Sequence, residues 1–344
     1  MRRDDLPDVI REHSPTVAVD VTNAFLDQHP DWRVRYGSRA MSAGVQDAGY
    51  HLGFLAAAVE ADSPAAYAAY ARWAARVLAS RGIAIPFLKE NLVQVRDALS
   101  ARLSEERSAI VAAYFQSALD ALAAEPELTE EPILGLAAQI FLQAIVTGQR
   151  HAAVQIAKEA LRNGLSLRDL YVDVFQSALY EVGARWESNR LSVAQEHMAT
   201  AITQYVMAQI YEPPDVRETP ARGRVVLTGV EGELHSVGAV MVADLLETSG
   251  FEVRFLGTNL PPASILGVVR DVAPSHVAVS TTMLFNVGAV RQLILSLRSE
   301  FGDRVRVVVG GAAFRTNAEL WRQVSADAYA PDLRGIESAF AGTN

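Results

Sequence analysis

The sequence predicts a protein of mixed α and α/β class: an N-terminal helical domain, a four-helix bundle and a C-terminal doubly wound parallel sheet. Two proline-rich breaks, Glu125–Pro132 and Glu212–Gly223, divide its 344 residues into three segments. Proline restricts its own backbone and that of the residue before it, so such clusters favour linkers. Apolar residues recur at helical spacing before the second break and in short continuous runs after it. We therefore predict domains at residues 1–125, 126–212 and 221–344.

The first segment is rich in alanine and shows no strand-like alternation. Ser63-Pro64 and Ser104-Glu105-Glu106 are typical helix starts, because serine caps the first turn and proline fits its first position. The predicted helices are Trp32–Val59, Ala65–Leu78, Pro86–Leu103 and Ser104–Ala123.

The second segment has four helical stretches joined by short connections, and that pattern favours an up-and-down bundle. Asn163-Gly164 predicts a left-handed helix end, and Ser166 with Asp169 predicts the next start. The predicted helices are Pro132–Thr147, Gln149–Asn163, Ser166–Trp186 and Ser192–Tyr211.

In the third segment, strands and helices alternate, which indicates a parallel sheet covered on both faces. The predicted helices are Gly238–Ser249 and Ala289–Phe301. The predicted strands are Arg224–Gly229, Phe251–Gly257, His276–Ser280 and Arg306–Gly311. In such folds ligands bind beyond the carboxyl ends of the strands.

The composition excludes several classes of protein. Net charge is −9, and the N-terminal helices lack a basic recognition helix, so nucleic-acid binding is not expected. The absence of cysteine excludes disulfides, thiolate metal sites and thioether-attached tetrapyrroles. No signal peptide and no membrane-length apolar run is visible, so we expect a cytoplasmic protein without a membrane partner.

The loop after the first strand carries the strongest chemical pattern. His235 lies in a glycine-rich turn, two residues after Glu233. A carboxylate that binds one ring nitrogen of histidine fixes the tautomer and leaves the other nitrogen to ligate a metal. The alternative is an ordinary solvated loop histidine.

The combined motifs resemble those of the cobalamin-binding Rossmann-like family. Glu233-x-His235-x-x-Gly238 is followed by Ser280-x-Thr282 and by Gly310-Gly311, in the family's order, over Arg222 to about Phe340. The resemblance implies that His235 is the lower cobalt ligand. It also implies that Ser280, Thr282 and the two glycines line a cleft for the nucleotide tail, with Leu234 and Ser236 beside the cofactor. Here Glu233 replaces the family's aspartate.

The bundle carries a second resemblance. Trp186, followed after nine residues by Glu196-His197, is similar to the cap of light-sensing adenosylcobalamin regulators. Those residues would enclose the upper face and the adenosyl group. A histidine that follows the tryptophan in some regulators is Glu187 here, so capture of the photoproduct at that position is not expected. Apart from this resemblance, a tryptophan on a helix is usually a core residue, and a Glu-His pair usually lies on the surface.

The N-terminal domain adds a further expectation. Tyr50 and His51, with Arg33, Arg35 and Arg39, suit a linear tetrapyrrole, whose propionates would pair with arginine. A helical domain joined to a cobalamin cap and sheet resembles the photocobilins, which implies a bilin such as biliverdin, held noncovalently. Aromatic residues at helical spacing are alternatively core residues.

The leading functional prediction is a light sensor that is not an enzyme, with adenosylcobalamin as cofactor and biliverdin as second chromophore. Its output would be a change of homo-oligomer or of contact with a separate effector protein. The alternative is a corrinoid carrier for a methyltransferase system, whose cap must open. A mutase subunit is not supported, because no barrel to hold its substrate is visible.

Overall fold

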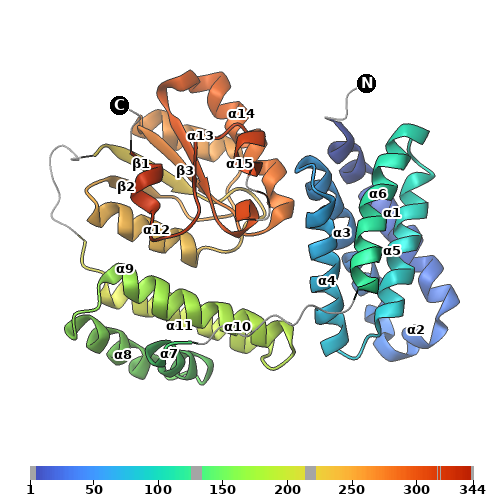
Figure 1. Cartoon of the computed structure of the whole chain (residues 1–344), viewed down its shortest axis with the longest axis horizontal. Coiled ribbons are helices and arrows are strands. Elements are labelled where there is room, and N and C mark those ends of the chain that lie inside the picture. Colours follow the sequence, from blue (N-terminus) through green and yellow to red (C-terminus); the bar gives the residue numbers. More distant parts are fainter. Residues whose placement is uncertain (1–4, 125–133, 214–221, 316, 318, 342–344) are drawn as a thin grey trace. The chain divides into compact units, whose positions relative to one another are not determined.

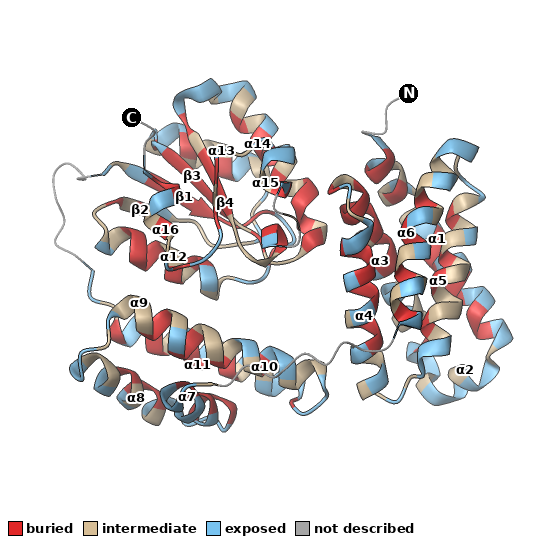
Figure 2. Ribbon diagram, viewed as in Figure 1, coloured by how far each residue is buried: buried red, intermediate tan, exposed pale blue. Residues whose placement is uncertain are grey.

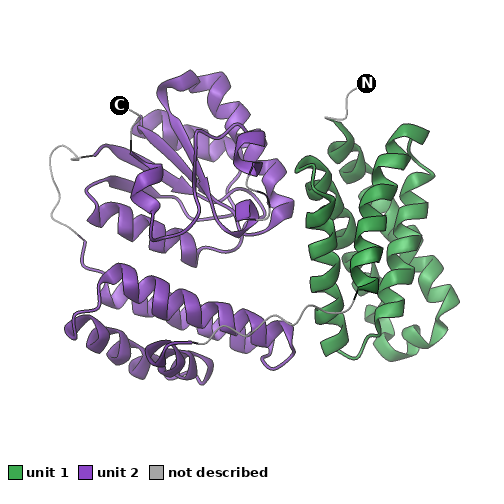
Figure 3. Cartoon of the chain, in the orientation of Figure 1, with its two compact units in different colours: residues 1–128 green, residues 129–344 purple. Residues whose placement is uncertain are grey.

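The computed structural model describes residues 5–124, 134–213, 222–315, 317 and 319–341. The chain forms two compact units, residues 1–128 and 129–344 (Figure 3). The first predicted break lies outside the described residues, as does most of the second. Within the described ranges, no helix is both long enough and apolar enough to cross a membrane.

The first unit is helical, as predicted (Figure 1). Two details of the prediction are wrong. Gly37, with φ of +55°, interrupts the expected helix Trp32–Val59, and the sequence analysis missed the long first helix. The helices are α1 (Leu6–Gln28), α2 (Pro30–Tyr36), α3 (Ala40–Glu60), α4 (Pro64–Ser80), α5 (Ile85–Ser100) and α6 (Glu105–Ala123).

The core of the first unit lies mainly between α1 and α3 and between α4 and α6 (Figure 2). Alanines at positions 56–58 of α3 are fully buried and allow close helix approach. Tyr67 of α4 and Phe115 of α6 are also fully buried and meet edge to face.

The second unit begins with the predicted bundle. Its third helix is continuous across three segments, and its fourth begins with a capping box between Ser192 and Gln195. The elements are α7 (Leu136–Val146), α8 (Arg150–Arg162), α9 (Leu167–Asp169), η3 (Leu170–Gln176), α10 (Ser177–Glu187) and α11 (Val193–Ile210).

The η3 segment is a π-helix inside this third helix. The Ser177 hydroxyl donates to the Val172 carbonyl, five residues earlier, at 3.1 Å. A π-helical turn holds an extra residue, and such turns are often found at functional positions. Here it carries the buried Tyr171, Val174 and Phe175.

A five-stranded parallel sheet follows, in the order β2-β1-β3-β4-β5. The doubly wound class is confirmed, but the prediction missed α13 and the short β5. The strands are β1 (Arg224–Thr228), β2 (Glu252–Phe255), β3 (His276–Ser280), β4 (Arg306–Gly310) and β5 (Ala328–Ala330). The helices are α12 (Val237–Thr248), α13 (Pro262–Val272), α14 (Val287–Phe301), α15 (Leu320–Gln323) and α16 (Ile336–Ala339).

One apolar cluster joins the bundle to one face of this sheet. It includes Tyr171 and Ile210 from the bundle, Leu245 from α12, and Ala278 and Val308 from the sheet. Strand residues alternate between faces, so Ser280 and Gly310 point to the same face as Ala278 and Val308. Ser280 and Gly310 are also partners in the β3–β4 register.

A buried carboxylate lies in this cluster and predicts a pH dependence. Asp244 is 8% exposed and accepts a hydrogen bond from the Tyr171 hydroxyl at 2.5 Å. Burial raises the pKa of Asp244 to about 6, against the hydrogen bond from Tyr171, which lowers it. Because the pKa of Asp244 is raised in the folded state, the protonated carboxyl group stabilises the fold. This contribution is complete below pH 4 and is lost as the pH rises through 6.

We expect Asp244→Asn to remove this dependence while still accepting from Tyr171. Between pH 4 and pH 7 the wild-type unit should lose about 2–3 kcal/mol relative to the variant. Thermal unfolding across that range measures the difference. Asp303→Asn, at an exposed carboxylate, is the control. Parallel pH curves for the wild type and Asp244→Asn would contradict the assignment.

Candidate functional site

The site begins at the β1–α12 loop, where a buried glutamate holds an exposed histidine. Glu233 is fully buried, whereas the His235 side chain is 54% exposed. One carboxylate oxygen of Glu233 lies 2.6 Å from His235 Nδ1 and accepts from the His235 backbone N–H at 3.0 Å. With Nδ1 engaged, the ring presents Nε2 for coordination.

The second carboxylate oxygen of Glu233 ties this loop to the turn after β3. It accepts from the Thr282 backbone N–H at 2.8 Å and from Asn286 Nδ2 at 3.1 Å. Burial alone would raise the pKa of Glu233, but hydrogen bonds from His235 and Thr282 lower it to about 2. The carboxylate therefore stays ionised and keeps accepting from the imidazole.

Small residues make room for the longer side chain. A Cβ at Gly229 would lie 3.3 Å from Glu233 Cγ, and one at Gly232 would lie 3.0 Å from Asn286 Oδ1. Glu233, which stands where the family has an aspartate, therefore reaches the imidazole of His235. Asn286 was not predicted from the sequence. The only sign of it was that Glu233 has one methylene more than the family's aspartate, so its carboxylate can reach a more distant partner.

The predicted cleft residues lie at the same edge of the sheet. Ser280 and Gly310 end neighbouring strands and face α12 and α16. Gly311 has φ of +102°, and a Cβ there would lie 2.2 Å from the Thr281 carbonyl oxygen. Gly238 differs, because a Cβ there would meet nothing within 4 Å. The first turn of α12 therefore borders open space.

Two contacts fix the direction in which α11 crosses this edge. Gln204 Nε2 donates to Ser236 Oγ at 3.0 Å, and the Tyr211 hydroxyl donates to Glu247. Helix α11 therefore runs beside α12 in the same direction. Since a helix rises about 1.5 Å per residue, the part before Gln204 extends about 16 Å past the start of α12.

That overhang carries two of the predicted cap residues. His197 lies two turns before Gln204 on the same face, and its side chain is 75% exposed. Its Nδ1 contacts Glu196, whose other oxygen accepts from the Thr200 hydroxyl at 3.0 Å. Trp186 is half-buried near the end of α10, which packs against α11. The overhang and the His235 loop thus belong to one edge of the unit.

Exposed apolar side chains occur around this edge. Leu234, beside His235, is 74% exposed, and Val193, at the start of α11, is 55% exposed. Tyr180 of α10 is 54% exposed, and its hydroxyl accepts from Arg315 Nη2, beyond β4, at 3.1 Å. Neither Tyr180 nor Arg315 was singled out from the sequence, because their spacing carries no motif.

The residues expected to hold a bilin do not come together in the first unit. His51 is 4% exposed, its Nδ1 lies 2.7 Å from the Tyr70 hydroxyl, and burial lowers its pKa to about 4. Its neighbour Tyr50 is 47% exposed. Arg33 pairs with Asp27, and Arg35 donates to the Arg81 carbonyl. His51 is therefore a neutral core residue, and these two arginines have other partners.

Comparison with known proteins gives two family matches. Residues 137–211 and residues 223–333 each match a family model described as a B12 binding domain. Helices α8–α11 and all but the first residue of α7 lie in the first range, and β1–β5 lie in the second.

Curated relatives and a solved structure match about half of the chain. Trimethylamine corrinoid protein 1 of Methanosarcina acetivorans is 29% identical over 196 residues, which are 54% of this chain and 89% of that protein. Dimethylamine corrinoid protein 3 of Methanosarcina mazei is 30% identical over 153 residues, 44% of this chain and 90% of that protein. The monomethylamine corrinoid protein of Methanosarcina barkeri shares the fold, with a TM-score of 0.50 and 21% identity over 58% of this chain and 93% of that chain.

Proposed function

The chain belongs to the cobalamin-binding family of corrinoid proteins, and on this premise we propose that it is a corrinoid carrier that serves a methyltransferase system. The family matches lie within the second unit. The first unit lies outside both matched ranges.

The light-sensor prediction is wrong. The relatives that overturn it are corrinoid proteins named for trimethylamine and dimethylamine, and each matches about half of the chain. These relatives favour the alternative prediction, a corrinoid carrier. The Trp186…Glu196-His197 spacing does not distinguish the two roles, because a helical cap over the cofactor is compatible with either.

The observation that carries the proposal is the Glu233–His235 pair at the carboxyl edge of the sheet. A bound corrinoid supplies a cobalt centre that can accept and pass on a methyl group. His235 Nε2 would hold it from below, Glu233 would keep the imidazole oriented, and Asn286 would keep Glu233 in place.

The other predicted residues fit the same group. An added Cβ at Gly238 would meet no other described part of the chain within 4 Å, so a ligand has room beside the first turn of α12. Ser280 and Gly310 would line the path of the nucleotide tail under α12 and α16. Leu234 and Val193 would cover apolar parts of the corrin, and Trp186, Glu196 and His197 would shield its upper side. Neither an adenosyl group nor biliverdin is needed for this role.

The affinities for three cobalamins distinguish a carrier from a protein that requires the adenosyl form of the cofactor. We expect hydroxocobalamin and methylcobalamin to bind with dissociation constants within about threefold of each other, and adenosylcobalamin to bind no more tightly. Repeated reduction and remethylation with methyl iodide should leave the cofactor on the protein. Loss of the cofactor in each cycle, or a preference of more than about tenfold for adenosylcobalamin, would contradict a carrier.

A further inference from the structure

Three aromatic side chains form a patch on the surface of the first unit. Tyr50 and Phe54 lie one turn apart on α3, and Trp73 lies on the neighbouring helix α4. Tyr50 is 47% exposed, and the partly exposed rings of Phe54 and Trp73 have centroids 6.4 Å apart. We call these three residues the aromatic face. Neighbouring exposed aromatic rings are typical of a surface that meets another protein.

Two opposite charges border the aromatic face. Asp47 lies on α3, one turn before Tyr50, and Arg72 lies on α4, next to Trp73. Both residues are exposed, and neither forms an ion pair with another described residue. The aromatic face is therefore flanked by one acidic and one basic group, each open to a partner of opposite charge.

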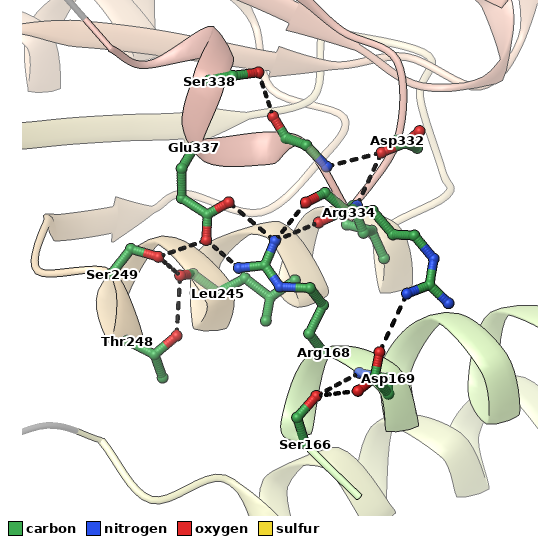
Figure 4. A network of polar contacts seen from close by, with 12 residues as sticks. Ser166, Arg168, Asp169, Leu245, Thr248, Ser249, Asp332, Arg334, Glu337 and Ser338 are labelled. Atoms are coloured by element: carbon green, nitrogen blue, oxygen red, sulfur yellow. Dashed lines mark hydrogen bonds and ion pairs between the residues drawn. The ribbon is translucent and has the colours of Figure 1, made fainter.

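Charges are matched where segments pack together in the second unit, as Figure 4 shows. Arg168 of α9 pairs with Glu337 of α16 and donates to the Arg334 carbonyl at 2.8 Å. The Arg334 side chain in turn pairs with Asp169 at 3.1 Å and with Asp173 at 2.6 Å. Such charge-assisted bonds are strong and directional. The open charges beside the aromatic face thus contrast with the charges at a packed contact of the same chain.

The positions of the two charges make this surface complementary to itself. Helices α3 and α4 are joined by residues 61–63 and run antiparallel. His51 Nδ1 lies 2.7 Å from the Tyr70 hydroxyl, which sets these two residues at about the same height. Asp47 lies one turn from His51 and Arg72 lies half a turn from Tyr70, in the same direction. A two-fold axis along the helices therefore places α3 against α4 of a second copy, with Asp47 of each copy opposite Arg72 of the other.

Two glycines beside Tyr50 allow a second helix to come close. Gly49 and Gly53 lie one turn apart on α3, and neither has the positive φ that would require glycine. A Cβ at either would meet no described atom within 4 Å, apart from its chain neighbours and the backbone of its own helix. Each glycine weakens a helix by about 1 kcal/mol relative to alanine. Contacts within the first unit do not explain them, whereas close approach of another helix does.

From these observations we propose that two copies of this chain form a homodimer through the aromatic face. Tyr50, Phe54 and Trp73 lie at the centre of the interface, and two symmetric Asp47–Arg72 pairs border it. The aromatic rings supply the apolar contact, and the charges select a second copy as the partner. The inference goes beyond the carrier function and does not depend on it, because both family matches lie in the second unit.

Sedimentation equilibrium of the full chain measures the dimer, which should form with or without hydroxocobalamin. Partial desolvation raises the pKa of Asp47 to about 6, so measurement at pH 8 keeps its carboxylate ionised. Asp47→Arg and Arg72→Asp should each raise the dissociation constant of the dimer about tenfold or more, because like charges then meet twice. Combining the two changes restores opposite signs and should return the constant to within about threefold of the wild type. Glu12→Arg, at an exposed carboxylate on α1, is the control and should leave it unchanged.

A chain that stays monomeric up to about 100 μM would overturn the proposal. A dimer that neither single change weakens would also overturn it, because the contact would then lie on another surface. The combined variant separates lost charge pairing from misfolding, and its failure to dimerise would contradict the paired geometry. If hydroxocobalamin does not bind but the dimer responds as expected, the carrier function fails and the dimer stands.

Discussion

Replacing His235 by alanine should lower the affinity for cobalamin about 100-fold and remove the protein nitrogen from the cobalt. Loss of residues that merely orient a metal ligand costs 10-fold to 100-fold, so loss of the ligand itself should lie at the upper end or beyond. The buried Glu233 would also lose the imidazole and retain only its backbone and Asn286 donors. Equilibrium binding measures the affinity. In ¹⁵N-labelled protein, the ¹⁵N splitting in the electron spin resonance spectrum of the reduced cofactor measures ligation by the chain, because the cofactor's own base carries ¹⁴N.

His151→Ala is the control for this experiment. His151 is an exposed residue on α8 and lies in no part of the site described above. It should leave the affinity and the nitrogen splitting unchanged. A ¹⁵N splitting from the labelled protein that persists in His235→Ala would show that another residue of the chain holds the cobalt.

Gly311→Ala should have the largest effect on folding. The φ of +102° is unfavourable for any residue with a side chain, and the new Cβ would lie 2.2 Å from the Thr281 carbonyl oxygen. Backbone atoms cannot yield as a flexible side chain can, so β4 or the turn after β3 must shift. We expect a loss of more than about 3 kcal/mol in the stability of the second unit, measured by denaturant unfolding.

Gly238→Ala is the informative comparison with Gly311→Ala. Apart from its chain neighbours and the backbone of its own helix, no described atom lies within 4 Å of the added Cβ, and alanine favours a helix by about 1 kcal/mol over glycine. The protein without cofactor should therefore be as stable as the wild type or slightly more so. Cobalamin affinity should nevertheless fall, because the methyl group enters the space assigned to the cofactor. Unchanged affinity would place the cofactor elsewhere.

The fold class could be predicted because its causes are local in the sequence. Apolar residues at helical spacing identified α7–α11, and runs such as His276–Ser280 identified buried strands. The short β5 was missed because its three residues, Ala328–Ala330, contain no long apolar run. Helix α1 was missed. Pro15 lies inside it, and a proline usually interrupts a helix, but α1 continues past Pro15 and buries one face.

The site could be predicted only where a motif spans a few residues. Glu233 and His235 are two positions apart, and their contact follows from that spacing. Asn286 contacts Glu233 from 53 residues away, and only the β1–β3 pairing brings them together. In the first unit the opposite error occurred. Adjacent polar and aromatic residues suggested a binding site, whereas a helix directs Tyr50 outward and His51 inward.

The π-helical segment η3 means that the rotational phase of α10 depends on one extra residue far from the cofactor site. An α-helix turns 100° per residue and a π-helical turn absorbs one extra residue, so converting 170–176 to regular α-helical hydrogen bonding without a deletion would rotate all of α10 by about that angle. Trp186 and Tyr180 would then face new directions, although neither had been replaced. A change of hydrogen-bonding pattern in 170–176 would thus turn the cap residues as effectively as a substitution within the cap, whereas deleting one residue at the same time would keep their direction.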